Sequence, residues 1–269
     1  MNYTVSEKYF KLFSDLIYEK SGINIHNGKK ELLQARIAKI LRREKLKDYK
    51  ELYEKVKNDK SGRYLTLLLN SISTNKTSFF REEKHFKFLS SVAIKELENR
   101  KNDYTLRCWS AGCSSGEEVY SIAITVLESL KNPDAWKIKI LGTDLSYDVL
   151  NTATKGIYPY ESVSFLPKNK IQKYFIVNNG QVEVDRKLKN IVIFRWLNLM
   201  QPFPFRNKLD FIFCRNVMIY FDKKTKENLI KRLYDCLDYN GYLFIGMSES
   251  LTGIKHNFKY IMPSVYKKV

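Results

Sequence analysis

The stretch Arg107–Ala123, RCWSAGCSSGEEVYSIA, decides the fold of this 269-residue chain. An apolar strand is expected to run into a loop of small residues, followed by an amphipathic helix. Gly112 and Gly116 let this loop approach a ligand closely, because glycine has no Cβ and tolerates unusual backbone angles. A second expected strand, 137–144, ends at Asp144. Strand, glycine turn, helix, strand and acid in this order are typical of a nucleotide cleft in which the acid binds a ribose.

The class of nucleotide follows from what the loop lacks. The spacing allows an NAD site, but there is no G-x-G-x-x-G fingerprint. An adenosyl ligand without a pyrophosphate fits better, and S-adenosylmethionine (SAM) is the obvious candidate. Two alternatives stay open at this point. The loop can be an ordinary tight turn, and Asp144 can simply cap a helix that starts near Ser146.

Composition narrows the protein class. The chain has no apolar run of about 18 residues, which argues against a transmembrane helix. Its N-terminus has no apolar segment of the kind that marks a secretory signal, so we expect a cytoplasmic protein. The four cysteines show no C-x-x-C pair and are interpreted as reduced thiols, and no metal is expected. The three histidines, His26, His85 and His256, are scattered and are expected at the surface.

A net charge of +18 is typical of proteins that bind nucleic acid, but the distribution of the charge along the chain weakens that interpretation. Residues 1–74 carry 16 Lys/Arg and 9 Asp/Glu, a net of +7, and the rest is spread along the chain. A basic protein suits an acidic substrate, and we expect one here. A monomer is assumed by default.

Two domains are expected, with a boundary near Ser73–Lys76. Residues 1–74 show helical periodicity throughout and predict an all-α domain. On one of its helices, Arg36, Lys39 and Arg43 are spaced to share a face, which makes them candidates for docking an acidic helix. An ordinary solvated helix face is the alternative.

Residues 75–269 are expected to form the larger domain. Strands alternate with helices from Thr105 onward, which predicts a mostly parallel, doubly wound α/β sheet of Rossmann-like type. Residues 155–190 interrupt this rhythm. Asn178-Asn179-Gly180 between two alternating apolar runs predicts a β-hairpin, and hence a small inserted antiparallel lobe.

Four further segments, taken with the glycine loop, resemble the chemotaxis receptor methyltransferases (CheR family) over essentially the whole chain. They are NKTSFFR (75–81), Asn198-Leu199, DFIFCRNVMIYF (210–221) and GYLFIGMSESL (241–251). The resemblance implies an enzyme that uses SAM to methylate glutamate side chains on the acidic cytoplasmic helices of chemoreceptors, with S-adenosylhomocysteine (SAH) as product. Two departures are Val119, where the family usually has proline, and Met247, where histidine is common.

The resemblance also implies site residues. Arg81 and Tyr220 correspond to residues associated with methyl transfer. The expected cofactor-binding residues are Asn75, Thr77, Arg81, Gly112, Glu117, Asp144, Asn198, Leu199, Arg215 and Asn216. We expect Arg81 to hold the acceptor carboxylate, because a guanidinium matches two carboxylate oxygens. Asp144 is expected to bind the ribose, and Glu117 to face the ribose or the methionine amino group. The alternatives are an interdomain lock for Arg81 and a core aromatic for Tyr220.

Two rival functions are considered. The first is a nucleic-acid methyltransferase. Amino-methylating enzymes of this kind usually carry an Asn/Asp-Pro-Pro-Tyr-type motif after the fourth strand. This chain has Cys214-Arg215-Asn216-Val217 there, without proline, which argues against this function. A SAM-dependent sensor without turnover is the second rival, and the presence of Arg81 and Tyr220 argues against it.

Overall fold

The computed structural model describes residues 4–72 and 75–269. Ser73 and Thr74, at the expected domain boundary, lie outside the described residues. The N-terminal part is helical, as expected. Its helices are α1 (Glu7–Ser21), α2 (Lys30–Arg43), α3 (Tyr49–Asn58) and α4 (Arg63–Ile72). Ser6 and Asp48 cap α1 and α3 by accepting hydrogen bonds from main-chain amides.

A seven-stranded sheet forms the centre of the described part after residue 75. Its strands are β1 (Thr105–Ala111), β2 (Lys137–Asp144), β6 (Val192–Trp196), β7 (Leu209–Cys214), β8 (Leu237–Ile245), β9 (Lys259–Met262) and β10 (Val265–Lys267). The strand order is β6-β2-β1-β7-β8-β10-β9, and only the β8–β10 and β10–β9 pairs are antiparallel. The mostly parallel, Rossmann-like sheet is thus confirmed. The strands β9 and β10 were not expected.

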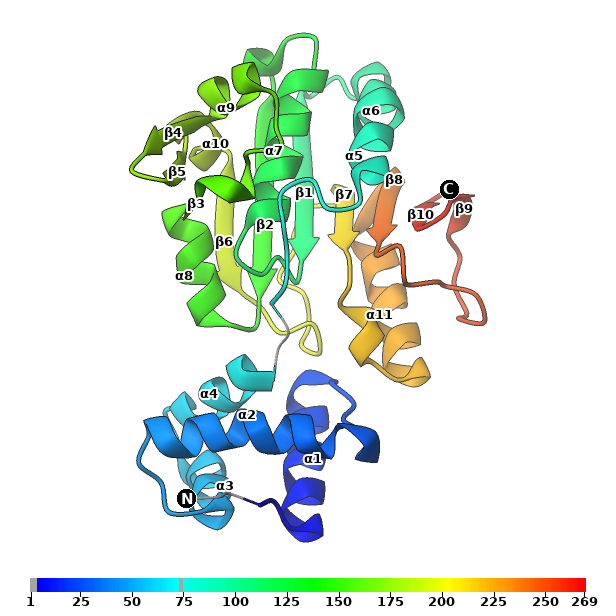
Figure 1. Ribbon diagram of the computed structural model, residues 1–269. Coiled ribbons are helices and arrows are strands. Elements are labelled where there is room, and N and C mark those ends of the chain that lie inside the picture. Colours follow the sequence, from blue (N-terminus) through cyan, green and yellow to red (C-terminus); the bar gives the residue numbers. More distant parts are fainter. Residues whose placement is uncertain (1–3, 73–74) are drawn as a thin grey trace.

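Helices cover both faces of the sheet (Figure 1). One face carries α5 (Glu83–Phe88), a π-helical turn (Leu89–Ala93), α6 (Ile94–Arg100), α7 (Glu117–Ser129) and α8 (Tyr147–Lys155), while α11 (Lys223–Cys236) packs on the other. The surface position expected for His85 is wrong. Its ring is fully buried beneath the sheet, edge-on to Phe244.

The inserted lobe is present as a separate three-stranded sheet. Its elements are β3 (Ile157–Pro159), α9 (Lys168–Tyr174), β4 (Phe175–Asn178), β5 (Gln181–Val184) and α10 (Arg186–Lys189). The antiparallel strand order is β3-β5-β4. Asn179 and Gly180 both have positive φ, 45° and 74°, as a two-residue hairpin turn requires. The expected hairpin is confirmed.

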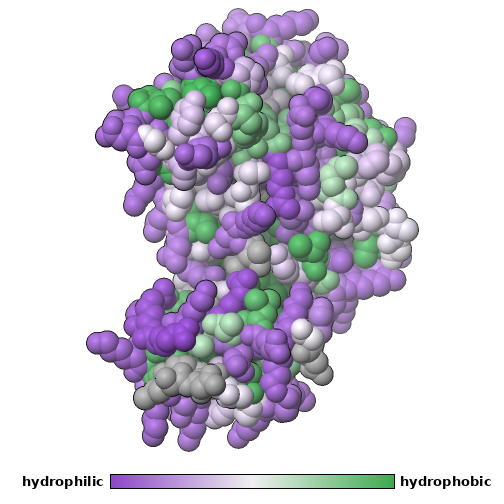
Figure 2. Space-filling view, viewed as in Figure 1, coloured by the Kyte–Doolittle hydropathy of each residue, from purple (hydrophilic) through white to green (hydrophobic). Residues whose placement is uncertain are grey.

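The helices α1–α4 lie beneath the carboxyl ends of the parallel strands (Figure 1). Strand order reverses between β1 and β7, and in open α/β sheets ligands bind at such a switch point. Figure 2 shows a mainly hydrophilic face, with a recess where the helical bundle meets the sheet.

Candidate functional site

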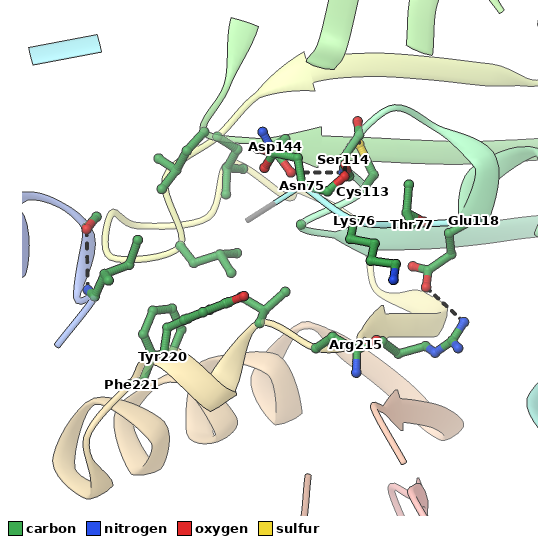
Figure 3. A pocket seen from close by; sticks show the side chains of 18 of the residues that line it. Asn75, Lys76, Thr77, Cys113, Ser114, Glu118, Asp144, Arg215, Tyr220 and Phe221 are labelled. Atoms are coloured by element: carbon green, nitrogen blue, oxygen red, sulfur yellow. Dashed lines mark hydrogen bonds and ion pairs between the residues drawn. The ribbon is translucent and has the colours of Figure 1, made fainter. Parts of the chain in front are cut away.

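A pocket lies at the carboxyl ends of β1, β2 and β7, with about 890 Å³ of empty space, part of it open to solvent. Its walls come from six parts of the chain: the end of α1 with the α1–α2 connection, residues 75–81, the glycine loop with the start of α7, and the loops after β2, β6 and β7. Figure 3 shows their side chains converging on one space. The sheet and the N-terminal helices together therefore build the site.

The glycine loop after β1 is bent sharply. The amides of Gly112 and Cys113 both donate to the Thr143 carbonyl at 2.8 Å, which ties the loop to the end of β2. Gly112 has a φ of +84°, and a Cβ there would lie 2.5 Å from Cγ2 of Val217. A larger residue at this position is therefore strained in its backbone and crowded by the opposite pocket wall.

Asp144 lines the pocket beside this loop (Figure 3). Its Oδ2 accepts from the Ser114 amide at 2.9 Å, and its Oδ1 from the Ser146 amide at 3.0 Å. Burial raises the pKa of this carboxyl. The helix-cap alternative for Asp144 is wrong, because Ser146 caps α8 with its own side chain. A carboxylate oxygen can accept more than one hydrogen bond, so Asp144 retains acceptors for ligand hydroxyls.

The segment 75–81 forms another part of the pocket wall and begins beside Asp144 (Figure 3). Asn75, Lys76, Thr77 and Arg81 line it, and Nη1 of Arg81 donates to the Lys76 carbonyl at 3.0 Å. The segment is fixed at two further points. Ser114 Oγ donates to the Asn75 carbonyl at 2.9 Å, and the buried Phe79 packs edge-on against aromatic rings of the inserted lobe.

Arg215 is held between two carboxylates. Its Nη1 lies 2.9 Å from Oε2 of Glu118, and its Nη2 lies 3.0 Å from Oε2 of Glu82. Nη2 also donates to the carbonyl oxygen of Arg81. With a side-chain exposure of 1%, the guanidinium is committed to protein partners, and Figure 3 shows its bond to Glu118.

Much of the remaining wall is apolar. This apolar part is formed by Ile23, Leu145, Leu197, Leu199, Val217, Tyr220 and Phe221. The main chain of Tyr220 accepts a hydrogen bond from the Asn24 amide at 2.9 Å, which joins this wall to the N-terminal helices. An apolar surface beside a few polar groups suits a ligand with a flat ring at one end and charges at the other.

The structure brings most of the predicted site residues together. The predicted residues that line the pocket are Asn75, Thr77, Arg81, Gly112, Asp144, Leu199, Arg215, Asn216 and Tyr220. Glu117 and Asn198 are not in that wall. The carboxylate of Glu117 accepts from Ser115 Oγ at 2.7 Å, and Nδ2 of Asn198 donates to the Lys20 carbonyl at 2.6 Å. Roles in ligand binding stay predictions for all of these residues.

Sequence reasoning missed other wall residues, notably Ser21, Ile23, Lys76 and Glu118. Glu118 carried a signal, since it adjoins Glu117 in the same helical turn and differs only in the direction it faces. Ser21 and Ile23 carried none, because they reach the pocket from a distant part of the chain.

The predicted docking residues line a separate groove with about 1130 Å³ of empty space, partly open to solvent. Arg36, Lys39 and Arg43 contribute to it from α2, together with Asp148 from α8. Nη1 of Arg36 donates to the Ser71 carbonyl at 2.5 Å, so this residue also helps hold α2 against α4. Lys39 and Arg43 are exposed.

Two kinds of feature are absent from the described part of the chain. No helix within residues 4–72 and 75–269 has both the length and the apolar character needed to cross a membrane. Across the same residues, no three His, Cys, Asp or Glu side chains are grouped so as to hold a metal ion.

Comparisons with known proteins give a consistent result. The family model described as CheR methyltransferase, all-alpha domain, matches residues 8–73, and that described as CheR methyltransferase, SAM binding domain, matches residues 75–266. A chemotaxis protein methyltransferase of Borreliella burgdorferi is 40% identical over 100% of this chain and 96% of its own length. Chemotaxis protein methyltransferase 2 of Pseudomonas aeruginosa is 35% identical over 96% of this chain and 91% of its own length. The chemotaxis protein methyltransferase of Escherichia coli is 34% identical over 97% of this chain and 91% of its own length.

Proposed function

Because the chain belongs to the CheR family of SAM-dependent chemotaxis methyltransferases, we propose that it methylates glutamate side chains of chemoreceptors, forming methyl esters. We assign residues 1–74 to a helical domain and residues 75–269 to the methyltransferase domain with its inserted lobe. The protein acts in the cytoplasm as a monomer, without a nucleic-acid partner.

The observation that carries this proposal is the position of Arg81. It lies in the wall of a pocket whose other residues suit an adenosyl ligand, including a glycine turn, a buried carboxylate and an apolar surface. A guanidinium at that place can hold an acceptor carboxylate with two parallel hydrogen bonds. The pocket thus offers neighbouring places for a methyl donor and an anionic acceptor.

The chemistry needs little from the protein beyond positioning. SAM supplies an electrophilic methyl group on a sulfonium. A glutamate side chain has a reference pKa of about 4.3, so it is already ionised at neutral pH and no general base is required. Arg81 orients the carboxylate, Tyr220 bounds the same space, and the apolar wall excludes water from the reacting charges. Asp144 accepts from the ribose hydroxyls.

The test uses SAM labelled on its methyl group. We expect the full-length protein to label a chemoreceptor cytoplasmic fragment and not RNA. Mild base should then release volatile methanol from the receptor sample, because carboxyl methyl esters are base-labile. Base-stable label on RNA would replace the proposed substrate class, and no label on either would favour a sensor without turnover.

Arg81→Ala tests the acceptor role within the same assay. We expect methyl transfer to fall by at least about 100-fold, because the acceptor loses its orienting group, while most SAH affinity remains. Lys84→Ala is the matched control, since Lys84 is an exposed cation three residues away and outside the pocket wall. Unchanged turnover in Arg81→Ala, or an equal loss in both variants, would reject the role of Arg81.

A further inference from the structure

The main chain around Arg81 has an unusual conformation. Phe80 and Glu82, the residues on either side of it, have φ angles of 51° and 61°. Residues with a Cβ rarely adopt this left-handed region, and they do so where surrounding contacts compensate. The Phe80 amide has such a contact, donating to Ser121 Oγ at 2.9 Å. The contacts of Glu82 are more extensive.

The Glu82 carboxylate joins two loops at the carboxyl edge of the sheet. Oε2 accepts from the Met247 amide at 3.0 Å, in the loop after β8, and lies 3.0 Å from Nη2 of Arg215, in the loop after β7. Oε1 accepts from Nδ2 of Asn216 at 3.4 Å. Only 15% of this side chain is exposed, so water competes weakly for these bonds.

Arg215 passes this constraint back to Arg81. Glu82 and Glu118 hold its guanidinium from two sides, and Nη2 donates to the Arg81 carbonyl. Glu118 is itself fixed, because its Oε1 accepts from Ser110 Oγ at 2.7 Å in β1. Strand β1 is thus linked through Glu118 and Arg215 to the main chain of Arg81.

We propose that Glu82 is a positioning residue for methyl transfer: with Glu118 it holds Arg215, and Arg215 holds the main chain from which Arg81 reaches the acceptor. This inference rests on the proposed function, in which Arg81 orients the acceptor carboxylate. Glu82 itself does not line the pocket, so its effect on the reaction passes through Arg215 and Arg81.

The test compares Glu82→Gln with Glu83→Gln. The first removes one of the two charges facing a buried guanidinium and keeps the side-chain shape. The second removes an exposed carboxylate whose partner is Lys87 on the surface. We expect kcat on a receptor fragment to fall about 100-fold in Glu82→Gln, as for a misplacement of about 1 Å, with SAH affinity changed less than about threefold. Glu83→Gln should stay within about twofold of wild type.

A double-mutant cycle separates positioning from a general loss of folding. If Glu82 acts through Arg81, Glu82→Gln should cost far less activity in an Arg81→Lys background than in the wild type. Equal losses in both backgrounds, or wild-type kcat in Glu82→Gln, would overturn the proposal. Should Glu82→Gln not fold, Glu118→Gln removes the other carboxylate from the same guanidinium, and the same non-additive loss is expected.

A readout without an acceptor keeps this inference distinct from the proposed function. Amide hydrogen exchange in residues 79–82 should be faster in Glu82→Gln than in Glu83→Gln, because the main chain at Arg81 is less constrained. Equal exchange rates would reject positioning by Glu82. If the wild type fails to methylate receptors, the proposed substrate is wrong while the exchange result still decides the role of Glu82.

Discussion

His85 is a titratable side chain in a place that disfavours its charge. It is fully buried, and neither ring nitrogen has a hydrogen-bond partner in the described part of the chain. Burial and the nearby charge of Arg215 lower its pKa from 6.5 to about 4, although Glu82 acts in the opposite direction. The native state therefore holds a neutral ring.

This shift predicts a pH-dependent stability. The unfolded chain takes up a proton near pH 6.5 and the folded chain only near pH 4, so the unfolded state binds more protons between these values. The contribution of the neutral His85 ring to the stability of the folded state is therefore complete above pH 6.5 and is lost as the pH falls toward 4. When the pH falls from 7.5 to 5, we expect protonation of His85 in the unfolded chain to lower the free energy of unfolding by about 2 kcal/mol.

Urea unfolding at both pH values measures this effect. In His85→Phe, the loss of stability between pH 7.5 and pH 5 should be smaller by that amount. The variant His26→Gln changes an exposed histidine and serves as the control. Its free energy of unfolding should fall between pH 7.5 and pH 5 by as much as that of the wild type. An undiminished pH dependence in His85→Phe would show that His85 is not the group that titrates.

At the scale of single residues, the sequence best predicts which side chains reach the pocket wall where these side chains end a strand or follow it closely. Asp144 is the last residue of β2, and Gly112 and Asn216 follow β1 and β7 within two residues. The carboxyl ends of parallel strands meet at one edge of the sheet, so these side chains lie together. Prediction was less effective inside a helix. Successive helical residues point about 100° apart, so Glu117 and Glu118 face different surroundings, and the printed order of residues does not say which one faces the pocket.

At the scale of elements, α2 lines the groove that we propose as the docking surface for an acidic partner. Lys39→Glu is expected to raise KM for the receptor fragment about tenfold and to leave SAH affinity unchanged, because it places a negative charge in the groove. Arg42→Glu is the matched control, since it makes the same charge change on an exposed position of α2 outside the groove wall. Equal effects of the two variants would indicate general electrostatic attraction in place of a docking surface.

Elements with strong local signals were predictable, and those with weak signals were not. The Asn-Gly turn between two alternating apolar runs identified the hairpin between β4 and β5. The strands β9 and β10 are only four and three residues long, and β9 is largely exposed, so no clear alternation marks them. They form because β10 pairs with the edge of β8, which is a tertiary contact.

At the scale of the whole molecule, the N-terminal helices contribute to the pocket. Hydrogen bonds join the two parts: Tyr18 Oη donates to Oδ2 of Asp222 at 2.6 Å, and Asn198 Nδ2 donates to the Lys20 carbonyl. They place Ser21 and Ile23 in the pocket wall. Such contacts between distant segments leave no periodicity or motif in either segment, which is why the sequence did not predict them.

This arrangement predicts how the molecule responds to SAH. Some amides can exchange only after a bound ligand has been released. When the ligand concentration is about 100 times the dissociation constant, hydrogen exchange of these amides is slowed by up to about 100-fold. We expect that protection at residues 112–116 and also at residues 21–25, measured by hydrogen exchange of the full chain. Helix α3 is the internal control, because it lies outside the pocket wall and should exchange at the same rate with or without SAH. Protection of residues 112–116 alone would show that the α1–α2 connection does not take part in cofactor binding, since a segment in contact with the ligand cannot open freely while the ligand is bound.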